Sequence, residues 1–138
     1  MTDIYSASLF LCCLTWVIVQ GTERCVRTIG RIECRQNPDE VLSAEIKLFD
    51  QDGPGILKIL DPDDLMGFTI ADQDGSFELE GCGGDRDWIP GLIKNHPEPY
   101  IEIIHFCNPE RKETVLKLSK FSVFVPNEYK PDTIVLDA

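Results

Sequence analysis

The chain is built from short apolar runs that alternate with polar residues and are separated by turn-forming residues. Runs of about four to eight residues with a period of two are typical of half-buried strands, whereas helices repeat apolar residues every three or four positions. Glycine, proline and aspartate between the runs indicate frequent turns. The clearest runs lie within residues 30–34, 47–52, 63–82, 99–110 and 121–129. We therefore expect an all-β chain.

About seven strands are expected, and this number with turns this frequent predicts a two-sheet sandwich. Asp74-Gly75 predicts a hairpin between the third and fourth strands, because glycine accepts the positive φ of such turns. The apolar alternation falls on even-numbered positions up to Leu118 and on odd-numbered positions from Phe121 onward. This change predicts a bulge or turn near Ser119-Lys120. The expected strands cover residues 25–35, 44–49, 65–71, 76–82, 100–107, 114–125 and 133–136.

The first 21 residues predict a signal peptide. Residues 7–19 (ASLFLCCLTWVIV) have the length of a signal-peptide core and are short for a membrane span. Residues 1–6 lack Lys and Arg and carry Asp3, which departs from the usual positive amino-terminal region. We expect a signal peptide over 1–21, a single domain over 22–138, secretion to the extracellular space and no integral membrane span after cleavage. An uncleaved anchor or a mis-assigned start is the alternative.

Cysteine usage agrees with export, because an even set remains once Cys12 and Cys13 leave with the leader. Four cysteines in a small secreted domain indicate two disulfides, in any of three connectivities. Zinc is disfavoured, since no cysteine pair has the two-residue spacing of a zinc site. The remaining cysteines are Cys25, Cys34, Cys82 and Cys107.

The mature chain is acidic. Removing Asp3 from the 24 acidic residues leaves 23 against 13 Lys and Arg, a net charge of about −10. Nucleic acid is therefore excluded as a partner, because phosphate binding needs a dense basic face.

Two DQDG segments resemble metal loops. In the second, the first EF-hand ligand would be Ile70, which cannot coordinate calcium. The first could bind calcium if the loop after it folds back, although solvated acidic turns are the more frequent outcome for such a loop. The candidate calcium ligands are Asp50, Asp52, Asp61, Asp63 and Asp64.

Catalysis is not expected, and neither is a cofactor. His105 is the best candidate for acid–base chemistry, but it shares strand parity with Ile101 and Ile103, which favours a buried structural role. His96 lies in a loop, and the chain contains no nucleophile-elbow, H-E-x-x-H or phosphate-loop motif.

The irregular segment 83–99 contains the best contact chemistry for a partner. Trp88 close to Asp85 and Arg86 has the composition of an interface anchor. Trp88 capping one end of the sandwich is the equal alternative.

Six short motifs follow one another in an order that resembles the transthyretin-like family of secreted proteins. The motifs are Gly30-x-Ile32-x-Cys34, Lys47-Leu48-Phe49-Asp50 with Asp52, Asp63-Asp64-Leu65, Asp74-Gly75-Ser76-Phe77, His105-x-Cys107 and Val125-Pro126 through Tyr129. The resemblance covers most of the mature chain. It implies a Greek-key sandwich like transthyretin, with the strands at 65–71, 44–49, 100–107 and 114–125 in one sheet and the others in the second.

The resemblance also implies a disulfide pairing. Cys34 and Cys107 would lie at one end of the sandwich and join the two sheets. Cys25 and Cys82 would lie at the other end, on the outside, with Arg27 opposite Glu80. Side-chain parity agrees with both pairs.

For function, the family implies little. The favoured hypothesis is a non-catalytic binding or adaptor module that recognises an extracellular protein or cell-surface ligand through its loops. The alternative is an oligomeric carrier of a small apolar ligand, as in transthyretin. A 5-hydroxyisourate-type hydrolase is less favoured, because the chain ends Ile134-Val135-Leu136-Asp137-Ala138 and lacks the enzyme's Tyr-Arg-Gly-Ser ending. We expect a monomer, since proline and charge beside the last strand discourage edge pairing.

Overall fold

The computed structural model describes residues 22–51, 62–85 and 96–138. The chain divides into two units, residues 24–83 with 97–138 and residues 1–23 with 84–96, and the larger unit is the subject here. The expected leader lies outside the described residues, so its cleavage stays a prediction. Within the described part of the chain, no helix has the length and apolar character needed to cross a bilayer.

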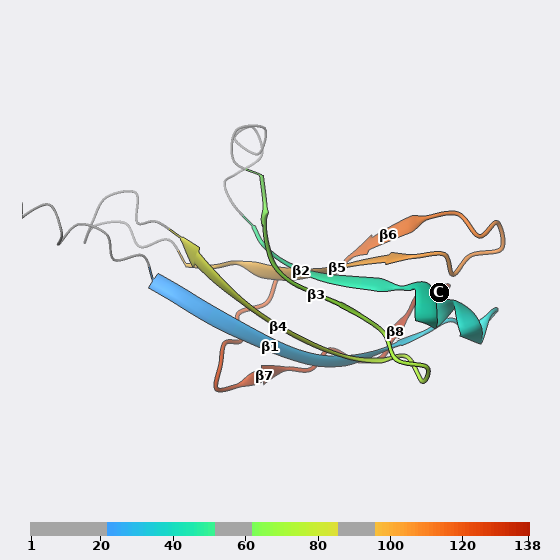
Figure 1. Cartoon of the computed structure of the whole chain (residues 1–138), viewed down its shortest axis with the longest axis horizontal. Coiled ribbons are helices and arrows are strands. Elements are labelled where there is room, and N and C mark those ends of the chain that lie inside the picture. The colour runs from blue at the N-terminus through green and yellow to red at the C-terminus, as the bar shows by residue number, and fades with distance from the viewer. Residues whose placement is uncertain (1–21, 52–61, 86–95) are drawn as a thin grey trace, which may run out of the picture. The chain divides into compact units, whose positions relative to one another are not determined.

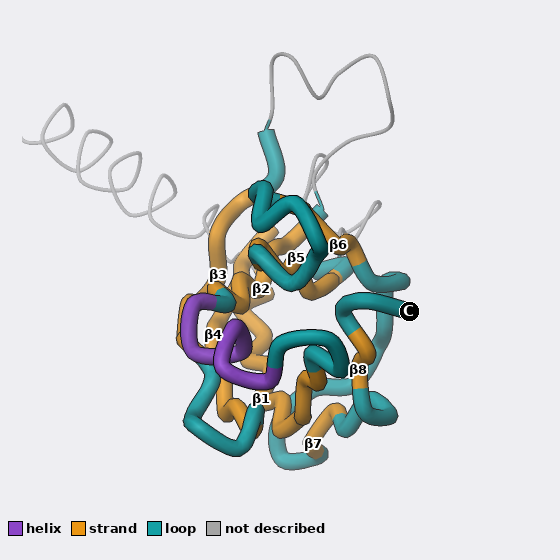
Figure 2. Tube along the Cα trace, turned by 90° about the vertical axis from the view of Figure 1, so that its right-hand side faces the viewer, coloured by secondary structure: helices purple, strands orange, loops and turns teal. Residues whose placement is uncertain are grey.

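The larger unit is a sandwich of two sheets, which confirms the expected all-β fold (Figure 1). One sheet has the strand order β3-β2-β5-β6, which are Asp64–Ile70, Glu45–Asp50, Pro99–His105 and Thr114–Lys117. The other has the order β4-β1-β7, which are Ser76–Asp85, Thr22–Glu33 and Glu128–Tyr129, and β8 (Ile134–Val135) also pairs with β1. Seen along the strands, the two sheets form two layers (Figure 2). This is the division of strands that the family resemblance implied.

Strands β2 (Glu45–Asp50) and β5 (Pro99–His105) form the centre of the first sheet. Burial alternates along β2, as it must when one face of a strand covers a core. Ile46 lies opposite Ile103, and Leu48 lies opposite Ile101. All four side chains are fully enclosed and make the inner face of this sheet.

A bulge changes which side chains of the edge strand β3 (Asp64–Ile70) face outward. Gly67 pairs with Leu48, and Leu65 pairs with the next residue of β2, Phe49. Met66 is therefore an extra residue with no partner on β2. An extra residue shifts the alternation of a strand by one position. Leu65 therefore lies on the same outer face as Phe68 and Ile70. The opposite edge of the sheet is β6 (Thr114–Lys117).

The second sheet is organised around the long strand β1 (Thr22–Glu33). Its neighbour β4 (Ser76–Asp85) buries Phe77 and Leu79 against the same core that encloses Val26 and Ile32 of β1. Two short strands, β7 (Glu128–Tyr129) and β8 (Ile134–Val135), pair with β1 in parallel. Strand β7 is not among the expected strands, since two residues are too few to show a period.

A 3₁₀ helix, η1 (Pro38–Ser43), connects β1 to β2. Proline within its first turn has the φ that a helix start requires. The helix buries Val41, and its end is closed by the Ala44 N–H, which donates to the Val41 carbonyl at 3.1 Å. No pattern in the sequence predicts it, because six residues make only two turns of a 3₁₀ helix, too few to show an amphipathic period.

The expected strand over 114–125 is wrong beyond Lys117. The Leu118 N–H still donates to the Ile101 carbonyl at 2.9 Å, but the Val125 N–H donates to the Cys25 carbonyl of β1 at 2.9 Å. The chain therefore leaves one sheet and joins the other within seven residues. This crossing, rather than a bulge within one strand, accounts for the change of apolar parity after Leu118.

The expected hairpin at Asp74-Gly75 is half correct. The turn forms, with Gly75 at φ 80° and its N–H donating to the Asp72 carbonyl at 2.9 Å. A Cβ on Gly75 would lie 2.1 Å from the Ile32 carbonyl oxygen, so both conformation and space require glycine. The strands that it joins, β3 and β4, nevertheless belong to different sheets.

Candidate functional site

The outer face of the sheet β3-β2-β5-β6 carries two rows of side chains that cross all four strands. Residues directly opposite one another on neighbouring strands share a face. The row nearer the start of β2 is Ile70, Glu45, Ile104 and Val115. The next row is Phe68, Lys47, Glu102 and Lys117. In both rows the residue on the β3 edge is apolar, whereas the β6 edge carries one apolar and one charged residue, Val115 and Lys117.

The apolar residues at the β3 edge are strongly exposed. Leu65, Phe68 and Ile70, which we call the β3 edge patch, retain 57%, 54% and 58% of their accessible surface. Val115 on the opposite edge is exposed to a similar extent. Single exposed apolar residues are ordinary, but three on one edge strand make this patch the candidate contact surface.

Beside this patch, Tyr100 joins β5 to the start of β3. Its hydroxyl donates to Asp63 Oδ2 at 2.8 Å, and its ring stacks on Phe49 with centroids 5.5 Å apart. Lys117 Nζ lies 3.6 Å from the centre of the Tyr100 ring and 3.8 Å from Asp63 Oδ2. Burial, and then the hydrogen bond to Asp63, raise the pKa of Tyr100 well above its usual value.

Asp50 is a buried carboxylate at the end of β2. It is 2% exposed, and its Oδ1 accepts the Glu98 N–H at 2.7 Å. A Cβ on Gly83 would lie 3.0 Å from Asp50 Oδ2, so glycine lets β4 approach the carboxylate closely. Asp50 therefore acts as an acceptor that links strands, within the protein rather than in a solvated turn.

The candidate calcium ligands are only partly described. Asp50 and Asp63 make the protein contacts given above, and Asp64 is exposed opposite Asp50 across β2 and β3. Asp52 and Asp61 lie outside the described residues. Calcium binding by this set stays a prediction.

The candidate interface residues fall at the limit of the described chain. Asp85 is the last residue of β4, while Arg86 and Trp88 lie outside the described residues. Their role in binding stays a prediction.

The β3 edge patch was not predicted from the sequence, because the bulge at Met66 hides from the sequence pattern that Leu65 faces outward. The burial of Asp50, in contrast, could have been predicted, because it stands two and four residues after the inward-facing Leu48 and Ile46 on the same strand.

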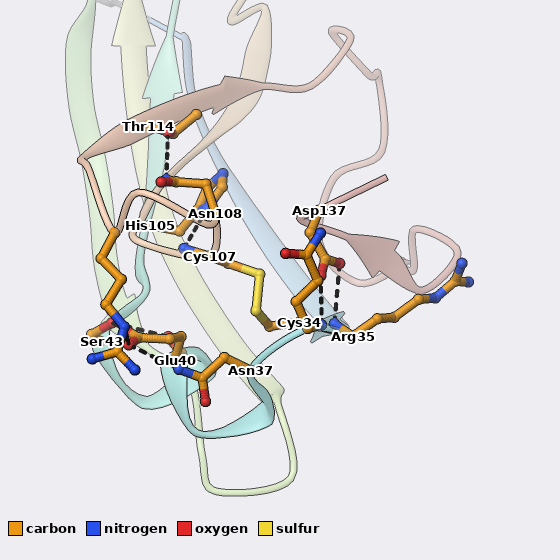
Figure 3. The surroundings of a disulfide bond; sticks show 12 residues. Cys34, Arg35, Asn37, Glu40, Ser43, His105, Cys107, Asn108, Thr114 and Asp137 are labelled. Atoms are coloured by element: carbon orange, nitrogen blue, oxygen red, sulfur yellow. Dashed lines mark hydrogen bonds and ion pairs between the residues drawn. A yellow bond between two sulfur atoms is a disulfide. The ribbon is translucent and has the colours of Figure 1, made fainter.

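His105 is enclosed in the core near the other end of the sandwich (Figure 3). Its Nδ1 accepts the Cys107 N–H at 3.2 Å. Burial lowers the pKa of His105, and the nearby negative charge of Asp137 opposes this only in part. A neutral, enclosed imidazole that caps a backbone N–H is a structural residue, as the strand parity predicted.

Asp137 holds the carboxyl end of the chain against the end of β1. Its two oxygens accept the N–H groups of Arg35 at 3.0 Å and Gln36 at 2.7 Å (Figure 3). These hydrogen bonds lower the pKa of Asp137. Cys34, Cys107 and Asp137 form the one group with metal-ligand proximity among the described residues, but the two sulfurs are bonded to each other and offer no thiolate.

The cysteines are joined in the two pairs that the resemblance implied, Cys25–Cys82 and Cys34–Cys107. The Cys34–Cys107 bond connects the end of β1 to the residues after β5 and is buried. The Cys25–Cys82 bond connects the neighbouring strands β1 and β4. Beside it, Arg27 Nε donates to Glu78 Oε1 at 2.9 Å instead of pairing with the expected Glu80. Long side chains in a twisted sheet reach diagonal neighbours.

Comparisons with known proteins agree with this architecture. Residues 29–126 match the family model TTR-52, which describes the Transthyretin-like family. Over 89 residues the chain is 32% identical to Transthyretin-like protein 1 of Caenorhabditis elegans, a match that covers 64% of this chain and 51% of the relative. The chain thus spans about half the length of that curated relative.

Among solved structures, a 9R-lipoxygenase from Cyanothece is similar to 82% of this chain and 16% of its own, at 15% identity and a TM-score of 0.42. A similarity at this level carries no argument about function. The family match, in contrast, extends over most of the described domain. The chain belongs to the transthyretin-like family.

Proposed function

We propose that the domain is a secreted, non-catalytic binding or adaptor module that recognises an extracellular protein. The observation that carries this proposal is the exposure of Leu65, Phe68 and Ile70 on one edge strand. Burial of three large apolar side chains against a partner would contribute a large part of a binding free energy.

The composition of β3 fits strand-to-strand recognition. Natural edge strands are protected by lysine, proline, inward charge or a bulge. Strand β3 (DLMGFTI) contains no lysine and no proline, and Asp64 at its start is its one charged residue. Its bulge at Met66 lies close to Gly81 of β4, so we place the added segment along Phe68–Ile70. An extended segment added beside such a strand gains main-chain hydrogen bonds, and its alternate side chains contact the patch. The preferred ligand is therefore an extended, partly apolar stretch of protein.

The segment after β4 supplies a second contact in this proposal. Asp85, Arg86 and Trp88 combine a large aromatic ring with both signs of charge. Loops on a rigid sandwich commonly carry recognition. The family match, the two disulfides and the apolar leader support an extracellular location. Amino-terminal sequencing of secreted protein should begin close to Thr22.

The test is capture of a partner from extracellular fluid by purified, oxidised protein. Phe68→Lys with Ile70→Lys should abolish capture of any protein that the wild type retains. Leu42→Lys is the matched control, because Leu42 is also exposed (49%) but lies in η1. Trp88→Ala tests the second contact separately. All variants must keep the wild-type thermal transition. Capture that survives the β3 substitutions would overturn the role of the edge patch.

Self-association is the outcome that would replace this proposal. We expect a monomer by light scattering. A dimer that the Phe68→Lys and Ile70→Lys substitutions dissociate would assign the patch to a second copy of the chain. A tetramer would instead support the oligomeric carrier.

A further inference from the structure

The two disulfides occupy opposite environments. Cys34 and Cys107 are 4% and 2% exposed, whereas Cys82 is exposed and Cys25 is half-buried. Thiol–disulfide exchange requires an attacking thiolate to reach one of the two sulfurs. We propose that Cys25–Cys82 is a modification site, at which small thiols open the disulfide and small-molecule disulfides reclose it by the reverse exchange, while the domain stays folded.

The reaction is an ordinary exchange in two steps. The thiolate of the small thiol attacks Sγ of Cys82, the more exposed cysteine, and forms a mixed disulfide. The Cys25–Cys82 bond breaks, and its electron pair leaves on Cys25, which takes a proton from water. A second small thiolate attacks the small-thiol sulfur of the mixed disulfide and releases the Cys82 thiolate. Two small thiols are thereby oxidised to their disulfide, and one protein disulfide is reduced.

The domain keeps its fold through this reaction because β1 and β4 are joined by other contacts. They are neighbours in one sheet, and the Ile32 N–H donates to the Gly75 carbonyl at 2.9 Å at the far end of the pair. On the outer face Arg27 pairs with Glu78. On the inner face Val26 and Leu79 are enclosed in the core. The exposed disulfide is therefore a link between strands that already hold together.

The buried disulfide has the contrary properties. Cys34–Cys107 joins the two sheets, so its loss would remove a covalent link across the core. Both of its cysteines are nearly inaccessible, and His105 and Asp137 lie around it (Figure 3). Its reduction requires opening of the domain, whereas reduction of Cys25–Cys82 does not.

Charge favours one class of thiol. The chain carries a formal charge of −11. Near the bond, the exposed Glu80 on β4 is balanced by the exposed Arg24 next to Cys25, and Glu78 is paired with Arg27, so the net charge of the whole chain decides the sign. An acidic surface slows the approach of an anionic thiol and favours a cationic one. Cysteamine should therefore react faster than glutathione, and salt should reduce the difference.

The experiment uses oxidised full-length protein whose free thiols, including any at Cys12 and Cys13, are first blocked with N-ethylmaleimide. The protein is then incubated with graded cysteamine or glutathione, labelled with heavy N-ethylmaleimide and mapped by mass spectrometry. Cys25 should gain the heavy label, and Cys82 should carry either the heavy label or cysteamine. Both changes should occur at least about tenfold faster than the labelling of Cys34 or Cys107. Thermal unfolding after this step should remain one cooperative transition.

The double variant Cys25→Ser with Cys82→Ser is the control. It should fold cooperatively and show no fast labelling. Equal labelling of all four cysteines, or loss of the cooperative transition at the first reduction, would overturn the proposal. Equal rates with cysteamine and glutathione would overturn the preference for a cationic thiol.

Discussion

Each end of the sandwich contains one disulfide bond, and the two bonds have different surroundings. At one end, the Cys34–Cys107 bond lies among buried groups, with His105 and Asp137 beside it. At the other, the Cys25–Cys82 bond is accessible, and the buried polar group nearby is Asp50, close to Gly83. In our proposal, burial of the sulfurs, rather than the size of the loop closed, separates the structural disulfide from the reactive one. The predictions below test that statement at each end.

The largest effect is expected from removing the buried disulfide. The two bonds span 73 and 57 residues, a difference worth only about 0.2 kcal/mol in loop entropy. Cys34→Ala with Cys107→Ala should nevertheless destabilise by about 3–5 kcal/mol, and by about 1–2 kcal/mol more than Cys25→Ala with Cys82→Ala, because a cavity remains in the core. Urea unfolding measures both. Equal losses would show that loop entropy alone matters.

At the accessible end, Asp50 should be the most sensitive polar residue. Asp50→Ala leaves the part-buried Glu98 N–H without this acceptor and should cost about 1–3 kcal/mol. Asp50→Asn keeps an oxygen in the same place and should cost less. Chemical denaturation compares the two variants. Identical losses would mean that the charge of Asp50, and not its hydrogen bond, is what stabilises the fold.

Substituting Tyr100, at the same end of the sandwich, should change the free energy of unfolding less and should alter its response to alkaline pH. Tyr100→Phe removes the hydrogen bond to Asp63 and should cost about 1 kcal/mol. Because the folded pKa of Tyr100 is raised, the unfolded chain loses the phenolic proton first, so stability should fall above about pH 10. The variant should lose less stability there than the wild type. Absorbance titration of the phenol gives an independent reading.

At the opposite end of the sandwich, His105 should make the stability of the domain depend on pH in the acidic range. Its folded pKa lies below the ordinary value of 6.5, so the unfolded chain binds the proton first. Its contribution is complete above about pH 6.5 and is lost as the pH falls through the lower, folded pKa. His105→Asn should flatten the slope of stability against pH in this window. An unchanged slope in His105→Asn would contradict the assignment.

Much of the fold could be predicted because its central strands are periodic. Ile46, Leu48, Ile101 and Ile103 alternate without interruption, and they form the inner face of one sheet. The order of strands and the cysteine pairs followed from the family resemblance. Local pattern could not supply the rest: η1 is short, β7 has two residues, and the path after Lys117 is set by a hydrogen bond from Val125 to distant Cys25.

The surface of the proposed function was harder to predict than the core. The bulge at Met66 brings Leu65 onto the face of Phe68, and only the pairing with β2 reveals it. Asp50 looked like the start of a solvated acidic loop, although its inward parity indicated burial. Asp85, Arg86 and Trp88 were chosen on composition alone, and their contacts await the capture experiment.

The parallel pairing of β7 and β8 with β1 has a consequence for biosynthesis. Thr28 pairs with Tyr129, Ile32 pairs with Ile134, and Asp137 caps the N–H groups of Arg35 and Gln36. Strand β1 thus finds these partners only about a hundred residues later in the chain. Contacts this distant in sequence form slowly, and an unpaired strand edge is prone to aggregation. Residues 128–137 must therefore be synthesised before the sandwich can be completed, and truncation before Glu128 should yield chains that depend on chaperones.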